Sequence, residues 1–230
     1  LEGRRSVQEA LDRPELVQAV FLEESLADDY ACLPGVNTYI VDSKLLKSIS
    51  TTETPQGIIA VVKMPHWSLA ELVKTKGLIV LLDQISDPGN MGSIIRSCWA
   101  LGVKGLLLAS GCADPFSPKV VRSSMGGILN LPLIDNITDQ ELDLLVGQGY
   151  EFICTGMQNA RDYYSVDLTG SKVLVMGSEA RGVSQEIISR SGCMIKIPMK
   201  SKVDSLNVAA ACAIIVGEAW GQRNGRSVKQ

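Results

Sequence analysis

The sequence is poor in the residues that hold metal ions in proteins. It contains one histidine, His66, and its six cysteines form no Cys-x-x-Cys pair. Zinc sites draw on closely spaced cysteines and histidines, so we expect no metal in this protein. We interpret the cysteines as reduced intracellular thiols, because Cys212 stands in the stretch VAAACAIIV, where a thiol packs as a small apolar side chain. His66 has no evident partner for catalysis, and we expect it to be structural or exposed to solvent.

Excess positive charge and long apolar runs are also missing. The 230 residues include 22 Lys and Arg against 25 Asp and Glu, a net charge of -3, so any contact with nucleic acid requires a local basic patch. The longest apolar runs, residues 78–82 and 208–217, are shorter than the roughly 18 residues that span a membrane. No secretory signal is visible at Leu1, and we expect a cytoplasmic protein whose native start precedes this residue.

Two familiar nucleotide-binding fingerprints are absent as well. The sequence has no Gly-x-Gly-x-x-Gly, because Gly147 and Gly149 are followed by Phe152 at the third position, and it has no Gly-Lys dipeptide of a phosphate-binding loop. These absences disfavour dinucleotide-dependent enzymes and P-loop NTPases. A content of 46% hydrophobic and 20% charged residues nevertheless indicates a folded protein with a substantial core.

The charge distribution divides the chain at about residue 76. Residues 1–76 contain 8 of the 22 basic and 11 of the 25 acidic residues, which leaves 14 of each in residues 77–230. Short, β-branched apolar stretches in the first part predict a small α/β unit. Its expected strands are residues 19–22, 37–41 and 57–62, with a helix over 43–49. Capping-box patterns at residues 6–9 and 68–71 predict two further helix starts.

From residue 77 onward, apolar strands alternate with helical stretches. The expected strands are residues 78–83, 105–109, 151–155, 172–177 and 193–198. Uniformly apolar strands separated by helices are typical of a parallel sheet with helices on both faces. Helices are expected over residues 90–101 and after Thr138, where the stretch TDQE is another capping box.

Polar residues concentrate in the loops after these strands, where parallel sheets bind their ligands. The first loop turns through Asp87-Pro-Gly and leads into a helix on which Ile94 and Cys98 share one apolar stripe. Arg96 lies on the roughly opposite side of this helix and is available to a ligand. A solvated arginine on a helix surface explains its position about equally well.

Two further strand ends carry glycine, charge and a helix cap. One apolar strand runs into Gly177-Ser-Glu-Ala-Arg-Gly, where glycine admits a ligand to the backbone, although a bland Gly-rich turn explains this stretch as well. After the strand that ends at Met199, Asn207 is expected to cap a helix that is apolar on every side up to Val216. Such a helix is buried inside the fold or against a second subunit, and we expect a homodimer.

Residues 77–230 resemble the SpoU family of the SPOUT superfamily, the S-adenosylmethionine-dependent RNA 2'-O-ribose methyltransferases. All three family motifs occur in order and at the family's spacing, which is highly specific. The matching residues are Asn90, Gly92 and Arg96 in motif one, Gly177, Glu179 and Gly182 in motif two, and residues 197–199 with 205–209 in motif three. Residues 1–76, including the stretch TPQGIIA, are similar to the ribosomal-protein-like substrate-binding module that precedes the catalytic domain in ribosomal-RNA members.

The resemblance implies an α/β fold with a parallel sheet and a C-terminal trefoil knot in residues 77–230, and an RNA-binding domain in residues 1–76. It implies S-adenosylmethionine as the cofactor, with its adenosine against Gly177, Ile197, Met199 and Leu206. The residues implied to organise catalysis around Arg96 are Asn90, Glu179, Ser205 and Asn207. The arginine is proposed as the base in related enzymes, but a strongly basic guanidinium group is better suited to stabilise a phosphate and an alkoxide.

Basic residues fall in or beside the motif loops and form a candidate RNA-binding patch. They are Lys119, Arg122, Arg181, Lys200 and Lys202, together with Arg96. We interpret this patch as the contact with RNA phosphates, which makes binding sensitive to salt. Scattered charge that serves solubility is the alternative.

These patterns predict a cytoplasmic, homodimeric enzyme that methylates an RNA ribose 2'-hydroxyl, with large-subunit ribosomal RNA favoured over tRNA because of the N-terminal module. A tRNA 2'-O-methyltransferase is one alternative. A non-catalytic ribosome assembly factor of the same fold is another, against which the intact Asn90, Arg96 and Asn207 argue. A generic nucleotide-binding α/β domain would show neither methyl transfer nor a dimer.

Overall fold

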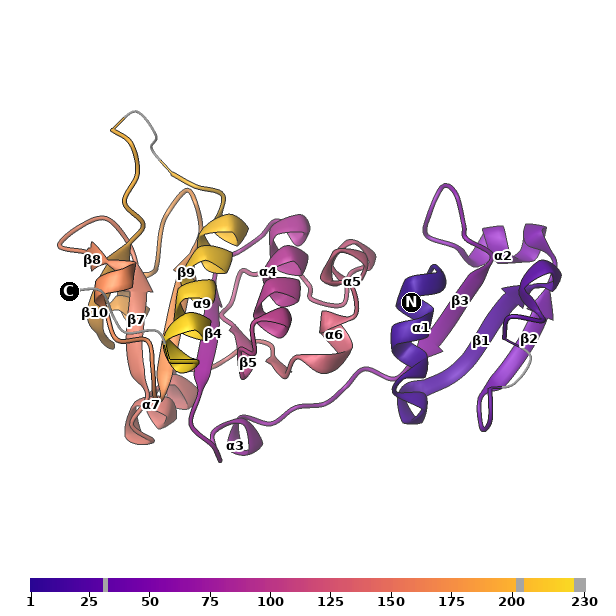
Figure 1. The fold of residues 1–230 in the computed structure, drawn as a ribbon, viewed down its shortest axis with the longest axis horizontal. Helices are drawn as coiled ribbons and strands as arrows, with labels where there is room; N and C mark the ends of the chain where they lie inside the picture. The colour runs from indigo at the N-terminus through magenta and orange to yellow at the C-terminus, as the bar shows by residue number, and fades with distance from the viewer. Residues whose placement is uncertain (31–32, 202–204, 226–230) are drawn as a thin grey trace.

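The structure of the chain is a computed structural model that describes residues 1–30, 33–201 and 205–225. Its strands form two sheets, one of 3 strands and one of 7 strands. Figure 1 shows the indigo and purple 3-stranded sheet apart from the larger sheet, to which it is joined by the chain that passes through α3 (Leu69–Leu72).

The smaller sheet has the strand order β2-β1-β3. The elements of this unit are α1 (Arg4–Leu11), β1 (Val17–Glu23), β2 (Asn37–Val41), α2 (Ser43–Ile49) and β3 (Ile58–Val62), with 3-10 turns at Pro14–Leu16 and Glu24–Leu26. β1 pairs in parallel with β2 and antiparallel with β3. The strands and the helix expected from the apolar stretches are confirmed, and Val7 and Ala10 of α1 pack into the core with Val20 and Ile58.

The first helix begins earlier than the sequence predicts. α1 starts at Arg4 with Gly3 as its N-cap, so Ser6 lies inside the helix and the capping box expected at residues 6–9 is wrong. The Gly3 amide donates to the Ile58 carbonyl at 3.1 Å, and Glu2 forms a bridge beside Ile59. Pairing with a distant strand therefore fixes where the chain enters α1, which a local pattern does not record.

The larger sheet has the strand order β6-β5-β4-β9-β7-β10-β8, and its strand pairs in the described chain are parallel. Its strands are β4 (Leu78–Asp83), β5 (Gly105–Leu108), β6 (Leu133–Ile134), β7 (Glu151–Thr155), β8 (Arg161–Asp162), β9 (Lys172–Gly177) and β10 (Ser191–Lys196). The expected strands are confirmed. The sequence missed β6 and β8, because two residues are too few to form a pattern.

Helices cover both faces of the larger sheet. They are α4 (Pro88–Ala100), α5 (Pro118–Ser124), α6 (Gly127–Asn130), α7 (Asp139–Gly147), α8 (Gln185–Ile188) and α9 (Val208–Arg223), with a 3-10 turn at Tyr163–Ser165. Val80 and Leu82 of β4 pack into the cluster that contains α4 and α9, whereas Ile79 and Leu81 pack with α7. The prediction of a parallel sheet covered on both sides is thereby confirmed, as is the capping box at Thr138.

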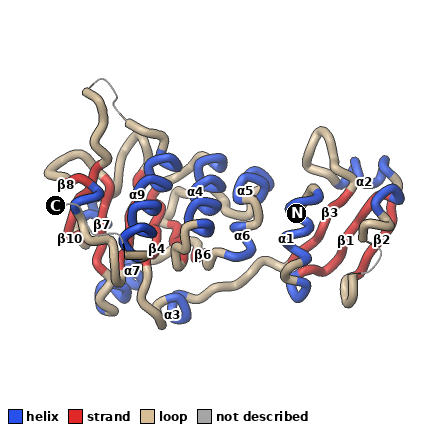
Figure 2. Tube along the Cα trace, viewed as in Figure 1, coloured by secondary structure: helices blue, strands red, loops and turns tan. Residues whose placement is uncertain are grey.

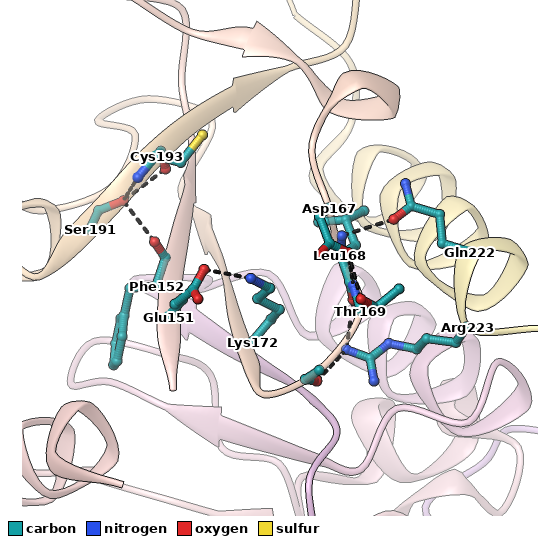
Figure 3. A network of polar contacts seen from close by, with 11 residues as sticks. Glu151, Phe152, Asp167, Leu168, Thr169, Lys172, Ser191, Cys193, Gln222 and Arg223 are labelled. Carbon is teal, nitrogen blue, oxygen red and sulfur yellow. Dashed lines mark hydrogen bonds and ion pairs between the residues drawn. The ribbon is translucent and has the colours of Figure 1, made fainter. Parts of the chain in front are cut away.

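The helix α9 lies beside α4 on one face of the sheet (Figures 1 and 2), and polar contacts hold its C-terminal end (Figure 3). The Gln222 side chain, 6% exposed, accepts from the Leu168 amide at 2.8 Å and donates to the Val166 carbonyl at 3.1 Å. The Arg223 guanidinium donates to the carbonyls of Leu168 and Gly170 at 2.7 and 2.8 Å. Because each of these contacts is a satisfied bond between segments distant in sequence, they fix the position of α9 on the sheet.

The segment before β4 packs with the larger sheet. Leu69 and Leu72 of α3 lie in the same apolar cluster as Ile79. The Tyr150 hydroxyl donates to the Thr75 carbonyl at 3.2 Å, which anchors the chain just before it enters β4.

Two properties expected from composition concern metals and membranes. In the described ranges no group of three His, Cys, Asp or Glu side chains could hold a metal ion. No helix in the same ranges combines the length and the apolar character needed to span a bilayer. Cys98 and Cys212 are both fully buried, and the hydrogen bond to Cys212 together with burial raises the pKa of Cys98 well above its ordinary value, so these thiols serve as core residues.

Candidate active site

The carboxyl ends of β7, β9 and β10 surround a cavity beside the N-terminal end of α9, here called the apolar cavity. Apolar side chains from several elements line it, among them Met157, Ile195 and Ile215. The structure also brings to it the residues predicted to bind the cofactor, which are Gly177, Ile197, Met199 and Leu206. Glu179 and Ser205, predicted as catalytic residues, lie on the same lining.

Gly177 is required by the close return of the loop that follows β9 (residues 178–184, here the β9 loop). A Cβ atom at position 177 would lie 2.2 Å from the Gly182 carbonyl carbon and 2.3 Å from the Val183 nitrogen. The loop is held in this form by the Gly182 amide, which donates to the Ser178 carbonyl at 2.8 Å. Because the clash would be with backbone, no side-chain movement can relieve it, and any larger residue at position 177 must displace the loop.

A buried carboxylate that the sequence analysis did not single out holds the far end of the β9 loop. Asp83, 3% exposed, ends β4 opposite Gly177 in β9, and its Oδ2 accepts from the Ser184 amide at 2.7 Å. Burying a carboxylate is costly unless it is hydrogen-bonded, so this contact fixes the return of the loop. The sequence did carry a signal, because Asp83 is the one charged residue of the otherwise apolar stretch LIVLLD.

Residues of all three motifs meet at the N-terminal end of α9. The Asn207 Oδ1 accepts from the amides of residues 209 and 210 at 3.0 and 3.3 Å, so the predicted cap is confirmed. Its side-chain nitrogen donates to the Asn90 Oδ1 at 2.8 Å, and the Glu179 Oε1 accepts from the Val208 amide at 3.1 Å. These bonds satisfy three amides of the helix end and join the start of α4 and the β9 loop to α9.

One member of the predicted basic patch, Lys119 of α5, lies beside the start of α4. Asp87 caps this helix by accepting from the Asn90 amide at 2.7 Å. That hydrogen bond and the Lys119 ammonium, 3.7 Å away, lower the pKa of Asp87. Lys119 and Asp87 are both exposed, so their ion pair is screened by solvent and leaves the lysine able to bind another anion.

The remaining predicted contacts with RNA are exposed but not gathered at one point. Arg181 in the β9 loop and Lys200, which follows Met199 of the apolar cavity, are exposed. Arg122 is exposed on α5, and its guanidinium is directed to the Thr51 hydroxyl of the smaller unit at 3.4 Å. Lys202 lies outside the described residues.

Arg96 is exposed on α4, as its place opposite the apolar stripe predicts. Ile94 and Cys98 are fully buried on the other side of the helix. The Arg96 side chain is not part of the lining of the apolar cavity or of the two cavities described next.

A polar cavity of about 550 Å³ lies between the ends of β4, β5 and β9, on the other side of the β9 loop. Its lining consists of Gln84, Ser86, Ser110, Gly111, Ser178, Ala180 and Arg181. A cleft lined by Asn90, Glu179 and Val208 adjoins both cavities. It shares Ser178 and Glu179 with the apolar cavity, and Gln84, Ser86, Ser178 and Ala180 with the polar cavity. Sequence reasoning missed Gln84, whose only signal is that it follows the strand directly.

The apolar cavity suits an adenosyl sulfonium by its chemistry. Ile197 and Leu206 offer flat apolar walls to a purine, while the strand ends offer backbone donors and acceptors to its edge. Gly182 has nothing within 4 Å of the position that a Cβ would take, so a ligand can approach the main chain there. The Glu179 carboxylate on the lining is complementary to a positively charged sulfur.

Two sequence models of known families match the chain. One is described as the SpoU rRNA Methylase family and matches residues 77–217. The other is described as RNA 2'-O ribose methyltransferase substrate binding and matches residues 1–68.

Individual relatives agree with these families. The chain is 31% identical over 216 residues to the 23S rRNA (guanosine(2553)-2'-O)-methyltransferase RlmP of Bacillus subtilis, which covers 94% of this chain and 86% of the relative. It is 36% identical over 183 residues to the 23S rRNA (uridine(2479)-2'-O)-methyltransferase of Streptomyces viridochromogenes, which covers 76% of this chain and 64% of the relative.

A solved structure extends the agreement to the fold and the cofactor. The SpoU methyltransferase AviRb from Streptomyces viridochromogenes, in complex with AdoMet, matches with a TM-score of 0.85 at 28% identity over 99% of this chain and 91% of that chain. The resemblance inferred from the three motifs is thereby confirmed. The chain belongs to the SpoU rRNA methylase family and is an S-adenosylmethionine-dependent RNA methyltransferase.

Proposed function

We propose that this protein methylates the ribose 2'-hydroxyl of one nucleotide in large-subunit ribosomal RNA. The observation that carries the proposal is the meeting of the three motifs at the N-terminal end of α9, where Asn207 bonds to Asn90 and Glu179 bonds to the Val208 amide. Asn90 and Glu179 line the cleft that adjoins both cavities. Both relatives described above are named as 23S rRNA 2'-O-methyltransferases, which supports ribosomal RNA over tRNA.

The roles of the site residues follow from what methyl transfer to a hydroxyl requires. The bound cofactor supplies an electrophilic methyl group on a positively charged sulfur. Ile197, Met199 and Leu206 would hold the adenosine, with the backbone at Gly177 close to it. Asn90 and Asn207, fixed by their mutual hydrogen bond, would orient the ribose, because alignment of the two reacting atoms is the main requirement of a direct displacement.

We assign Arg96 to the RNA rather than to proton abstraction. A guanidinium remains protonated at neutral pH, so it can stabilise a phosphate and the developing alkoxide but cannot readily accept the hydroxyl proton. Its exposure on α4 leaves it accessible to a large ligand. Ser205, on the lining of the apolar cavity, would complete the set of polar groups around the reacting atoms.

We propose that residues 1–76 bind the RNA substrate and that residues 77–230 carry out the reaction. The match of residues 1–68 to a substrate-binding family supports this division. Lys119, Arg122, Arg181 and Lys200, all exposed, would bind phosphates, and Lys202 belongs to the same proposal.

The assembly, topology and location are part of the same proposal. Ile214 and Trp220 on α9 are 39% and 50% exposed, and Trp99 on α4 is 39% exposed, so the helix that is apolar on every side is not fully covered within one chain. A second copy of the chain would cover this face, which supports a homodimer.

We further propose that the chain forms the trefoil knot of the family, since it returns from β10, near one edge of the sheet, to α9 beside α4. We also propose a cytoplasmic location, because ribosomal RNA is modified there.

The experiment that tests the function is methylation of separate RNA pools. The purified protein is incubated with tritiated-methyl S-adenosylmethionine and either unmodified ribosomal RNA or tRNA, and alkali-resistant ribose methylation is mapped. We expect label at one ribose of large-subunit ribosomal RNA. Label in tRNA alone would overturn the substrate, and absence of label from free RNA and from ribosomal particles, with cofactor binding intact by calorimetry, would favour an assembly factor without turnover.

A further inference from the structure

A second binding surface adjoins the cleft that holds the motif residues. The polar cavity of about 550 Å³ is large enough for one nucleotide and contains hydrogen-bonding groups of several kinds: the Gln84 amide, the hydroxyls of Ser86 and Ser110, and the Arg181 guanidinium. None of these residues is a defining position of the three family motifs. Arg181 lies within motif two, but at one of its variable positions.

The backbone at Gln84 adopts a conformation that favours glycine. Gln84 has φ of 58°, in the left-handed region that residues with a Cβ rarely occupy. The chain is fixed on both sides, because Asp83 lies in the β4–β9 ladder and the Ile85 carbonyl accepts from the Ala113 amide at 2.9 Å. A side chain kept at such a position carries a conformational cost that glycine would avoid, and such costs cluster at functional sites.

The Gln84 side chain has no hydrogen-bond partner within the described residues. It is half-buried, and its Cγ lies 3.4 Å from the position of a Cβ on Gly111, so the glycine on the opposite wall leaves it room. A side-chain amide offers one acceptor and two donors in one plane, which matches the hydrogen-bonding edge of a nucleobase better than a phosphate, an acceptor only. The Arg181 guanidinium on the same lining is suited to the phosphate.

The order of the three spaces matches the order of groups in the reaction. The cleft at Asn90 shares Ser178 and Glu179 with the apolar cavity. It overlaps the polar cavity more widely, because Gln84, Ser86, Ser178 and Ala180 line both. A nucleotide whose ribose occupies this cleft would place its 2'-hydroxyl toward the apolar cavity and its base toward Gln84. Proteins that read RNA sequence do so by hydrogen bonds to such unstacked bases.

We propose that the polar cavity receives the base of the methylated nucleotide and that Gln84 determines, through its side-chain amide, which base is accepted. This inference rests on the proposed function and adds a specificity determinant to it. Of the relatives named above, one is a guanosine and the other a uridine methyltransferase, so enzymes of this family differ in the base they accept.

The test uses four transcripts of the ribosomal RNA segment mapped by the methylation experiment, identical except for the base at the target nucleotide. The wild-type protein should prefer one base. In Gln84→Ala we expect kcat/KM for that base to fall by at least tenfold and the preference among the four bases to shrink to within a few-fold, with unchanged affinity for S-adenosylmethionine. Gln84→Gly, which removes the backbone cost as well, should show the same loss of preference.

The control is Asn136→Ala. Asn136 also has a left-handed backbone, with φ of 54°, and is exposed outside the three cavities. Its substitution should leave activity and base preference unchanged. Full activity and unchanged base preference in Gln84→Gly would mean that only the backbone conformation at position 84 matters and that its side chain does not contact the base. This result would overturn the proposal.

A binding measurement separates this inference from the proposed function. Chemical-shift perturbation of the protein by each of the four nucleoside 5'-monophosphates, in the presence of S-adenosylhomocysteine, reports the cavity directly. We expect one monophosphate to perturb residues of the polar cavity more strongly than the others in the wild type and this difference to vanish in Gln84→Ala. Equal perturbation by all four, or a preference retained by Gln84→Ala, would overturn the base contact even if ribosomal RNA is methylated, whereas a confirmed preference without RNA methylation would leave the contact and overturn the function.

Discussion

The apolar cavity and the polar cavity occupy the same edge of one sheet and differ in the side chains that dominate their linings. The first is walled by side chains such as Ile197 and Leu206, and the second by hydroxyl, amide and guanidinium groups. Only the β9 loop separates them, with Ser178 on the lining of both. The comparison shows how a parallel sheet can hold an apolar cofactor group and a polar RNA group within reach of each other, since the carboxyl ends of neighbouring strands present independent loops at one edge.

The position of the dividing loop should therefore have the largest effect on both cavities. In Gly177→Ala the new Cβ meets backbone at 2.2 Å, so we expect the affinity for S-adenosylmethionine to fall by about 100-fold or more and the free energy of unfolding to fall by about 2 kcal/mol. Calorimetry and urea unfolding measure these changes. Gly192→Ala in β10, where nothing lies within 4 Å of the new Cβ, is the matched control and should leave both quantities near wild type.

Loss of the hydrogen bond between Asn207 and Asn90 should have the next largest effect. Asn207→Ala removes the cap of α9 and the donation to Asn90, so we expect methyl transfer to slow by about 30-fold and the free energy of unfolding to fall by about 1 kcal/mol. Asn207→Asp keeps the capping acceptor but replaces the donor with a carboxylate oxygen and adds a negative charge near Glu179, so it should be as slow as the alanine variant but more stable than it. Methylation kinetics, urea unfolding and sedimentation distinguish these effects, and a fast Asn207→Asp variant would show that the donation to Asn90 has no part in the reaction.

Two substitutions with smaller expected effects should distinguish the functions of the two cavities. Leu206→Ala removes part of one apolar wall. We expect it to lower the affinity for S-adenosylmethionine by about tenfold without changing the KM for RNA. Arg181→Ala should have the reverse effect, with unchanged cofactor affinity and a salt dependence of RNA binding reduced by about one unit of slope. If either variant changed the binding of S-adenosylmethionine and of RNA equally, the two cavities would not be chemically distinct sites.

The thiols beside the two cavities should differ in reactivity without affecting catalysis. Burial raises the pKa of Cys154, in β7 just before the apolar cavity, to about 11, so roughly one thiol in a thousand is ionised at pH 8. Cys112, next to the polar cavity, is only partly buried, although burial also raises its pKa. We expect a thiol reagent to label Cys112 before Cys154, and labelling of Cys154 to accelerate as the pH rises toward 11. Mass spectrometry of peptides after timed labelling checks this order.

The sequence predicted the larger sheet, because uniformly apolar strands are a local feature. The structure brings residues of the three motifs together at one edge of this sheet. It predicted the cap at Asn207 from residue type alone, but not the donation to Asn90, which joins residues 117 positions apart. The sequence analysis did not single out Asp83 or Gln84, for a related reason. The contact of Asp83 with the Ser184 amide and the left-handed backbone of Gln84 arise only when β4 and β9 are neighbours in the fold. The start of α1 was wrong because pairing with β3 overrode the local capping pattern.

The most direct test of two chemically distinct sites at one edge is amide hydrogen exchange with S-adenosylhomocysteine and RNA added in turn. We expect S-adenosylhomocysteine alone to protect residues 155–157 and 195–199 but not residues 84–86 or 110–111, and RNA then to protect residues 84–86 and 110–111. Protection of residues 84–86 and 110–111 by S-adenosylhomocysteine alone, or no protection there by a methylated RNA, would contradict the division of this edge into a cofactor site and an RNA site.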